Sequence, residues 1–214
     1  MVTAWMGVTI HQNQERLILK RQHDLNDYLL ELVKLYFGDN TVLMEKLMSE
    51  VIKFAKQTLG AERGSFFIID QDNIDEMIAY LFDENDKPQR SRGLKVRFGK
   101  DRGIAGLVAR TGITMNIKDA YKDSRFNKEI DQKTGYITRS ILCMPVIGEN
   151  GILGVVQVIN KKNGGYFTAN DERLFKTFSL YCALALHYTN IHNQTTKMVV
   201  AHLTMSNMLV SHDY

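Results

Sequence analysis

The chain has 214 residues, of which 44% are hydrophobic, so it can bury one sizeable core with helices appended. Its formal net charge of +3 comes from 27 basic and 24 acidic residues spread along its length, which argues against a nucleic-acid-binding stripe. No apolar run approaches the roughly 20 residues of a membrane span, and the first residues lack a signal-peptide pattern. We therefore expect a soluble, cytoplasmic protein that binds neither nucleic acid nor membrane.

Helical spacing of apolar residues predicts an N-terminal linker helix within residues 1–38. The residues that follow this spacing are Leu17, Leu25, Leu29, Leu32 and Tyr36. The stretch Gly38-Asp39-Asn40-Thr41 stops this helix and caps a second one. The second helix has one apolar face and is expected to end near Gly60.

Strand-like segments follow at residues 65–70, 76–82 and 94–98. In the third segment apolar residues alternate with Lys95 and Arg97, which is typical of an antiparallel sheet with one solvent-facing side. Residues 139–146 and 152–159 predict a closing hairpin with a turn at 148–151. The order of elements favours an α+β fold.

Residues 99–136 are rich in glycine and charge, and they predict a short helix at 104–110 and a short strand at 114–117. Connections of this length in compact domains are usually functional. The stretch from Gly99 to Gly106 enters the short helix, so its exposed backbone N–H groups offer a site for one phosphate. The glycine spacing matches neither the P-loop nor the dinucleotide fingerprint, which disfavours those enzyme classes.

Three polar residues further along, Asp131, Thr134 and Thr138, place a carboxylate and two hydroxyls on one side of an expected helical turn. Hydroxyls in such a position either cap the turn or line a pocket wall over the sheet. The sequence leaves both alternatives open.

A distinctive motif joins the end of an apolar strand to the start of a long helix. Its residues are Asn160, Lys161, Phe167, Asp171 and Glu172. We favour a structural role, because Asn160 can satisfy backbone groups at a strand end and Asp171 forms a capping box with Thr168. Carboxylates in a first helical turn also complement the helix dipole.

The long helix is expected to resume or continue past Ile191 as a C-terminal connecting helix at residues 193–214. Its apolar stripe from Met198 to Val210 has no packing partner later in the chain. The stripe either folds back on the N-terminal helix or pairs with a second copy in a parallel homodimer. Both alternatives remain open.

The two cysteines, Cys143 and Cys182, lie in apolar segments, which predicts buried reduced thiols, with a disulfide as the less favoured alternative. The dipeptides His23-Asp24, His192-Asn193 and His212-Asp213 have no second ligand pair at a metal-site spacing. We therefore expect no metal and no cofactor in this chain.

The chain resembles a GAF domain of a cyclic-nucleotide phosphodiesterase, and we place this domain at residues 39–192. The motif from Asn160 to Glu172 carries the resemblance. Further blocks agree with it: Gly103-Ile-Ala-Gly106, Ala109-Arg-Thr-Gly112, Asn116-Ile-Lys-Asp119-Ala-Tyr121, Arg125-Phe126, Thr134-Gly135 and Ile141-Leu-Cys-Met-Pro145. Within the family the sequence is most similar to that of the second GAF domain of phosphodiesterase 10, with types 5 and 11 next.

The resemblance implies a GAF fold with a six-stranded antiparallel sheet, flanking helices and long N- and C-terminal helices. Helices on one side would form a homodimer or domain interface, and a lid on the other side would enclose cAMP or cGMP. The implied ligand-binding residues are Ser65, Phe82, Asp83, Ile104, Ala105, Asp131, Thr134, Thr138 and Gln157. The backbone of Ile104 and Ala105 would receive the cyclic phosphate.

Two departures from the family pattern bear on the ligand. Asn127 stands where some relatives have an aromatic lid residue, and Gln157 stands where a cGMP-binding relative has Glu. A glutamine amide can donate or accept, whereas a glutamate is repelled by the acceptors of adenine. The glutamine therefore favours cAMP over cGMP.

No catalysis is expected from this chain, because phosphodiester hydrolysis needs a metal pair held by His and Asp side chains. The resemblance implies a regulatory domain that controls an attached catalytic domain, where divalent metals would bind. One alternative is a GAF domain that dimerises and spaces other domains without a ligand. Another is a small thiol enzyme resembling methionine sulfoxide reductases, which would need an exposed Cys143 or Cys182 of low pKa.

Overall fold

The computed structural model describes residues 16, 20, 23, 27, 40–70, 73–82 and 94–210. The chain divides into a unit up to Leu43 and a unit from Met44 onward, and the second unit contains the fold described below. Four exposed helical residues are described from the expected N-terminal helix: Arg16, Lys20, His23 and Asp27. The apolar positions predicted for that helix lie outside the described residues.

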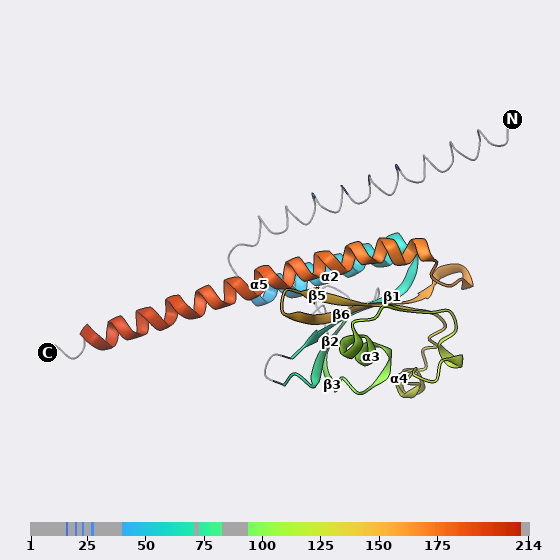
Figure 1. The fold of residues 1–214 in the computed structure, drawn as a ribbon, viewed down its shortest axis with the longest axis horizontal. Helices are drawn as coiled ribbons and strands as arrows, with labels where there is room; N and C mark the ends of the chain where they lie inside the picture. Colours follow the sequence, from blue (N-terminus) through green and yellow to red (C-terminus); the bar gives the residue numbers. More distant parts are fainter. Residues whose placement is uncertain are drawn as a thin grey trace. The chain divides into compact units, whose positions relative to one another are not determined.

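A six-stranded antiparallel sheet forms the centre of the second unit (Figure 1). Its strands are β1 (Ala61–Ile69), β2 (Glu76–Phe82), β3 (Leu94–Gly99), β4 (Met115–Ile117), β5 (Ile141–Gly148) and β6 (Gly151–Lys161). The strand order is β3-β2-β1-β6-β5-β4, so β1 and β6 are central. The predicted antiparallel sheet and its closing hairpin are confirmed.

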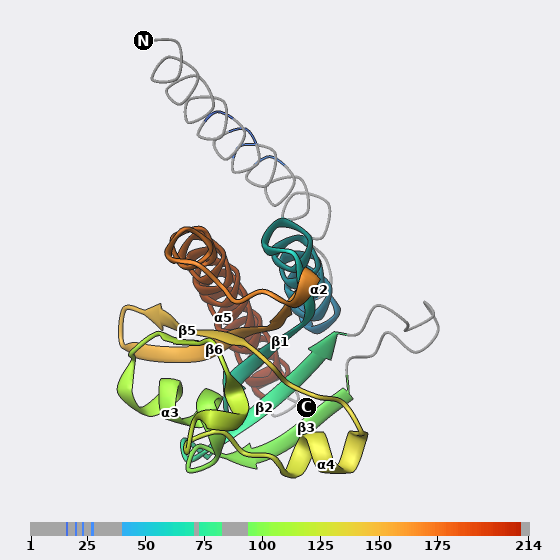
Figure 2. The same ribbon diagram turned by 90° about the vertical axis from the view of Figure 1, so that its right-hand side faces the viewer.

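Helices lie on both faces of the sheet (Figure 2). On one face are α2 (Asn40–Leu59) and α5 (Ala169–Val210); on the other are α3 (Gly103–Thr111) and α4 (Glu129–Thr134). Two short 3-10 helices, η1 (Ala120–Lys122) and η2 (Lys162–Gly164), complete the second unit. The predicted α+β architecture is therefore present.

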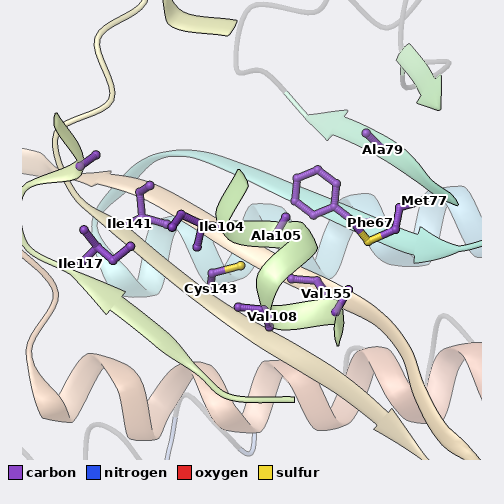
Figure 3. Packing of buried hydrophobic residues seen from close by; sticks show 12 residues of the cluster. Phe67, Met77, Ala79, Ile104, Ala105, Val108, Ile117, Ile141, Cys143 and Val155 are labelled. Atoms are coloured by element: carbon purple, nitrogen blue, oxygen red, sulfur yellow. The ribbon is translucent and has the colours of Figure 1, made fainter. Parts of the chain in front are cut away.

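Alternation along β1 separates the two cores. A Cβ atom on Gly64 would lie 2.5 Å from Cγ2 of Ile52, so this residue faces α2, and Phe66 points to the same side. Phe54 of α2 and Phe178 of α5 pack with ring centroids 5.8 Å apart on that side. Phe67 faces the opposite way and belongs to the apolar cluster beneath α3 (Figure 3).

At the end of the hydrogen-bond ladder between β5 and β6, the side chain of Asn160 takes the place of a backbone partner. Its φ of 56° lies in the left-handed region. Its Oδ1 atom accepts hydrogen bonds from the backbone N–H of Arg139 (2.6 Å) and Ser140 (3.3 Å), and its Nδ2 donates to the carbonyl of Ile137 (2.8 Å). Asn160 therefore fixes the chain where it returns to the sheet from α4.

The next residue of the motif connects β6 to α5. Lys161 Nζ lies 2.8 Å from Oδ1 of Asp171. The other carboxylate oxygen of Asp171 accepts from the backbone N–H and hydroxyl of Thr168 at 2.8 and 3.0 Å, and Thr168 Oγ1 accepts from the Asp171 N–H. The predicted capping box is present, and an ion pair holds it to the sheet.

Replacing Asn160 by Ala is expected to destabilise the fold, because two backbone N–H groups and one carbonyl lose their partner. We expect a loss of about 3 kcal/mol in the free energy of unfolding, measured by urea denaturation. Asn160→Gly loses the same hydrogen bonds but tolerates the positive φ, so its loss should be smaller than that of Asn160→Ala. Unchanged stability in both variants would contradict this account.

Replacing Gly106 by Ala tests the packing of α3 against the preceding loop. Alanine in a helix is normally favoured over glycine by about 1 kcal/mol. Here the added Cβ atom would lie 2.3 Å from the carbonyl oxygen of Lys100, and backbone would have to move. We expect a net destabilisation of about 1–3 kcal/mol by thermal or urea unfolding. A stabilised variant would show that this approach is looser than described.

Candidate functional site

Two polar side chains stand at the centre of the sheet face beneath α3. Ser65 of β1 and Gln157 of β6 are direct cross-strand partners, and both are half-buried. Cys143 of β5 continues this row, and Phe67 lies two residues from Ser65 on the same face. Neither the Ser65 hydroxyl nor the Gln157 amide has a hydrogen-bond partner among the described residues. Such a pair on an apolar wall can orient a polar ligand.

The first turn of α3 lies on the same side of the sheet (Figure 3). Ile104 and Ala105 are buried and pack in one cluster with Ile141 and Cys143. Arg102 precedes the helix, and its side chain does not cap it. Because the first N–H groups of a helix have no intrahelical partners and lie at the positive end of its dipole, they can receive an anion.

Residues 118–139, which we call the lid segment, contain η1 and α4. Asp131 of α4 is buried, and its carboxylate accepts hydrogen bonds from the N–H (2.6 Å) and hydroxyl (2.8 Å) of Thr138 and from the hydroxyl of Tyr121 (3.1 Å). Burial and the hydrogen bond to Asp131 raise the pKa of Tyr121. The carboxylate of Asp131 therefore holds the lid segment together.

The expectation that one helical turn carries Asp131, Thr134 and Thr138 is wrong. Gly135 adopts a left-handed conformation with φ of 69° and ends α4 at Thr134. Thr134 Oγ1 donates to the carbonyl of Ile130 at 2.8 Å, which is the capping alternative left open by the sequence. Thr138 reaches Asp131 from the chain beyond the turn.

Asn127 of the lid segment lies beside the start of α3. A Cβ atom on Gly103 would be 3.7 Å from Cβ of Asn127. The Asn127 side chain accepts a hydrogen bond from the N–H of Glu129 at 2.9 Å. The lid segment and the phosphate position expected from the sequence are therefore neighbours.

Glu62 and Tyr136 are residues that sequence reasoning missed. The Tyr136 hydroxyl donates to Oε2 of Glu62 at 2.7 Å, Asn160 Nδ2 donates to the same oxygen at 3.0 Å, and Arg139 pairs with Oε1. Burial acts to raise the pKa of Glu62, but these hydrogen bonds outweigh it and hold that pKa below its usual value. The only sequence signal for Tyr136 was its place after the Thr134-Gly135 block.

The predicted base-contacting residues of β2 are less completely described. Phe82 is the last residue of β2 and is in register with Gly64, whereas Leu81 is in register with Ser65. Asp83 lies outside the described residues. The structure thus brings Ser65, Gln157 and the start of α3 to one face of the sheet, with the lid segment at its edge.

The burial of both cysteine side chains argues against the thiol-enzyme alternative. Cys143 and Cys182 are free and fully buried, as predicted, and burial raises the pKa of both. A nucleophilic cysteine needs exposure and a lowered pKa. Within the described part of the chain, no group of three or more potential ligands could hold a metal ion. None of the described helices is long and apolar enough to span a bilayer.

Curated relatives are phosphodiesterases that are much longer than this chain. The chain is 39% identical over 194 residues to a probable 3′,5′-cyclic phosphodiesterase, pde-5, of Caenorhabditis elegans, which covers 88% of the chain and 26% of that protein. It is 34% identical over 197 residues to dual 3′,5′-cyclic-AMP and -GMP phosphodiesterase 11 of Drosophila melanogaster, which covers 86% of the chain and 13% of that protein. The chain therefore corresponds to a part of these relatives.

Solved structures share the fold at low sequence identity. A GAF domain from a phosphoenolpyruvate-protein phosphotransferase of Coxiella burnetii superposes with a TM-score of 0.65 at 18% identity, covering 83% of this chain and 96% of that one. A free methionine-R-sulfoxide reductase of Neisseria meningitidis superposes with a TM-score of 0.56 at 13% identity, covering 76% and 87%. The GAF domain family model matches residues 44–186. With this match and the GAF fold of its sheet and helices, the chain belongs to the GAF domain family.

Proposed function

We propose that this chain is a regulatory cyclic-nucleotide-binding GAF domain of a 3′,5′-cyclic-nucleotide phosphodiesterase. It binds cAMP in preference to cGMP and controls an attached catalytic domain allosterically. The observation that carries the proposal is the pair of half-buried polar side chains, Ser65 and Gln157, which have no hydrogen-bond partners among the described residues and lie beside the apolar cluster beneath α3. The likeness to phosphodiesterases supports the ligand class. We also propose that the protein is cytoplasmic. Among phosphodiesterase GAF domains, we propose that it corresponds to the second GAF domain of phosphodiesterase 10.

In the proposed complex the base lies over Ser65 and Gln157, and the cyclic phosphate meets the backbone N–H groups of Ile104 and Ala105. The lid segment closes over the nucleotide with Asp131, Thr134 and Thr138. Asp83 contributes to base binding, whereas Phe82 is left out of the proposed site because it pairs with Gly64, which faces α2. Support for the phosphate position comes from the first turn of α3, which no side chain caps among the described residues.

Transmission of the signal follows contacts that run from the lid segment through the end of β6 to α5. Asn160 binds the backbone on both sides of Thr138, and Lys161 binds Asp171 in the first turn of α5. A ligand that orders the lid segment therefore changes the contacts that hold the first turn of α5. Binding regulates the attached domain only if the two states of α5 differ in their free energy of ligand binding.

The domain limits remain predictions: a linker helix at 1–38, the GAF domain at 39–192 and a connecting helix at 193–214. α5 runs without a break from Ala169 to Val210. The connecting helix is therefore proposed as a rigid continuation of the domain.

A GAF domain that dimerises without ligand is the second candidate. The observation that favours it is the exposure of Leu180 (59%), Leu184 (46%), Met198 (71%) and Val199 (52%) on α5. In both candidates the terminal helices form a homodimer. Sedimentation of the intact chain during a cAMP and cGMP titration discriminates between them. A dimer that binds neither nucleotide would favour the spacer.

Replacing Ala105 by Phe is expected to abolish cAMP binding in calorimetry, because the ring overfills the cluster beneath α3 and displaces the first turn that receives the phosphate. Lys100→Ala should change the dissociation constant by less than about tenfold, roughly 1.4 kcal/mol, and added salt should weaken binding only slightly. Circular dichroism verifies that the variants keep their fold. If Lys100→Ala alone abolished binding, a salt-bridged phosphate would replace the helix-terminus account.

Replacing Gln157 by Glu is expected to shift the preference toward cGMP by about tenfold or more, because a carboxylate accepts from guanine N–H groups and repels adenine acceptors. The measurement is the ratio of the dissociation constants for cAMP and cGMP. Gln57→Glu makes the same chemical change at an exposed position of α2, on the other face of the sheet, and should leave the ratio unaltered. An equal ratio in all three proteins would remove Gln157 from the base site.

A further inference from the structure

Tyr136 connects the end of the lid segment to β1, and it lies outside the motif from Asn160 to Glu172. Its hydroxyl donates to Glu62 at 2.7 Å and accepts from Asn160 Nδ2 at 2.9 Å. The guanidinium carbon of Arg63 lies 3.8 Å from the centre of its ring. Both hydrogen-bonding functions and the ring face of Tyr136 are therefore engaged by residues of the two central strands.

Glu62 holds the lid segment at a second point as well. Its other carboxylate oxygen pairs with the Arg139 guanidinium, three residues after Tyr136. Hydrogen bonds in which one group is ionised are about twice as strong as those between neutral groups, and partial burial reduces their screening by solvent. Glu62 thus binds the chain on both sides of Thr138.

The position of Thr138 determines that of α4. Thr138 is bonded through its N–H and its hydroxyl to Asp131, which lies in the middle of α4. α4 ends at Thr134, and only Gly135 separates this end from Tyr136. A change at Tyr136 therefore reaches α4 both along the chain and through the bonds between Thr138 and Asp131.

We infer that Tyr136 and Glu62 are positioning residues that hold the lid segment in the place it occupies in this structure and thereby set how long a bound ligand stays. Neither residue needs to touch the ligand for this role. The part of the inference that concerns ligand residence time rests on the proposed function. The attachment of the lid segment by Tyr136 and Glu62 can be measured without any ligand.

Amide hydrogen exchange of the intact, ligand-free chain tests the hold directly. Tyr136→Phe keeps the ring over Arg63 but removes the hydroxyl. We expect the amides of residues 129–138 to exchange about tenfold faster, while the amides of β1, β5 and β6 keep their wild-type rates. Tyr166→Phe removes a hydroxyl from an exposed tyrosine and should change nothing. Unchanged exchange in the lid segment, or an equal rise throughout the sheet, would overturn the inference.

Glu62→Gln provides a second variant, because glutamine still accepts from Tyr136 but loses the charge that attracts Arg139. Its effect on exchange should be smaller than that of Tyr136→Phe. Combining the two substitutions should add less than the sum of the single effects, because Glu62→Gln also weakens the hydrogen bond from Tyr136 that Tyr136→Phe removes. Full additivity would show that the two residues do not act together.

The ligand arm uses cAMP and measures its dissociation rate by stopped-flow displacement. Tyr136→Phe should release cAMP about tenfold faster, with an association rate close to that of the wild type. If the wild-type chain binds neither cAMP nor cGMP, the proposed function fails while a faster-exchanging lid segment still supports the hold by Tyr136. If the chain binds cAMP and the variant releases it at the wild-type rate, the positioning role is overturned.

Discussion

The side chain of Asn160 joins three parts of the fold that are distant in sequence. It replaces strand pairing where β5 begins, it holds the chain that returns from α4, and it precedes the lysine that binds the first turn of α5. Its backbone adopts a left-handed conformation, which asparagine tolerates better than most residues. This amide anchors the chain that leaves the lid segment to the end of β6, and the neighbouring Lys161 connects that end to α5.

A contrast in hydrogen bonding separates the framework from the candidate binding face. The buried residues Asp131, Thr138 and Asn160 and the partly buried Glu62 satisfy one another and the backbone, so these polar groups stabilise the position of the lid segment. Ser65 and Gln157 have no such partners within the described residues, although they are half-buried. A ligand with complementary donors and acceptors would supply hydrogen-bond partners for these two side chains.

Sequence patterns were sufficient where local chemistry decides the structure. The bounds of β2, the hairpin of β5 and β6, and the capping box of Thr168 and Asp171 follow from alternation and capping rules. Thr138 was misplaced because a single glycine, Gly135, ends α4 one residue after Thr134. The contacts of Glu62 with Tyr136 could not be predicted, because they join positions 74 residues apart and no local pattern marks such pairs. Register is similarly non-local: it pairs Leu81 rather than Phe82 with Ser65.

The central claim is that this GAF domain receives a cyclic nucleotide between the sheet and α3. Calorimetric titration of the intact chain with cAMP and cGMP, and with 5′-AMP as a control that lacks the cyclic phosphate, tests it most directly. The account predicts saturable binding of cAMP, weaker binding of cGMP and much weaker binding of 5′-AMP. The absence of binding by both cyclic nucleotides at millimolar concentration would contradict it.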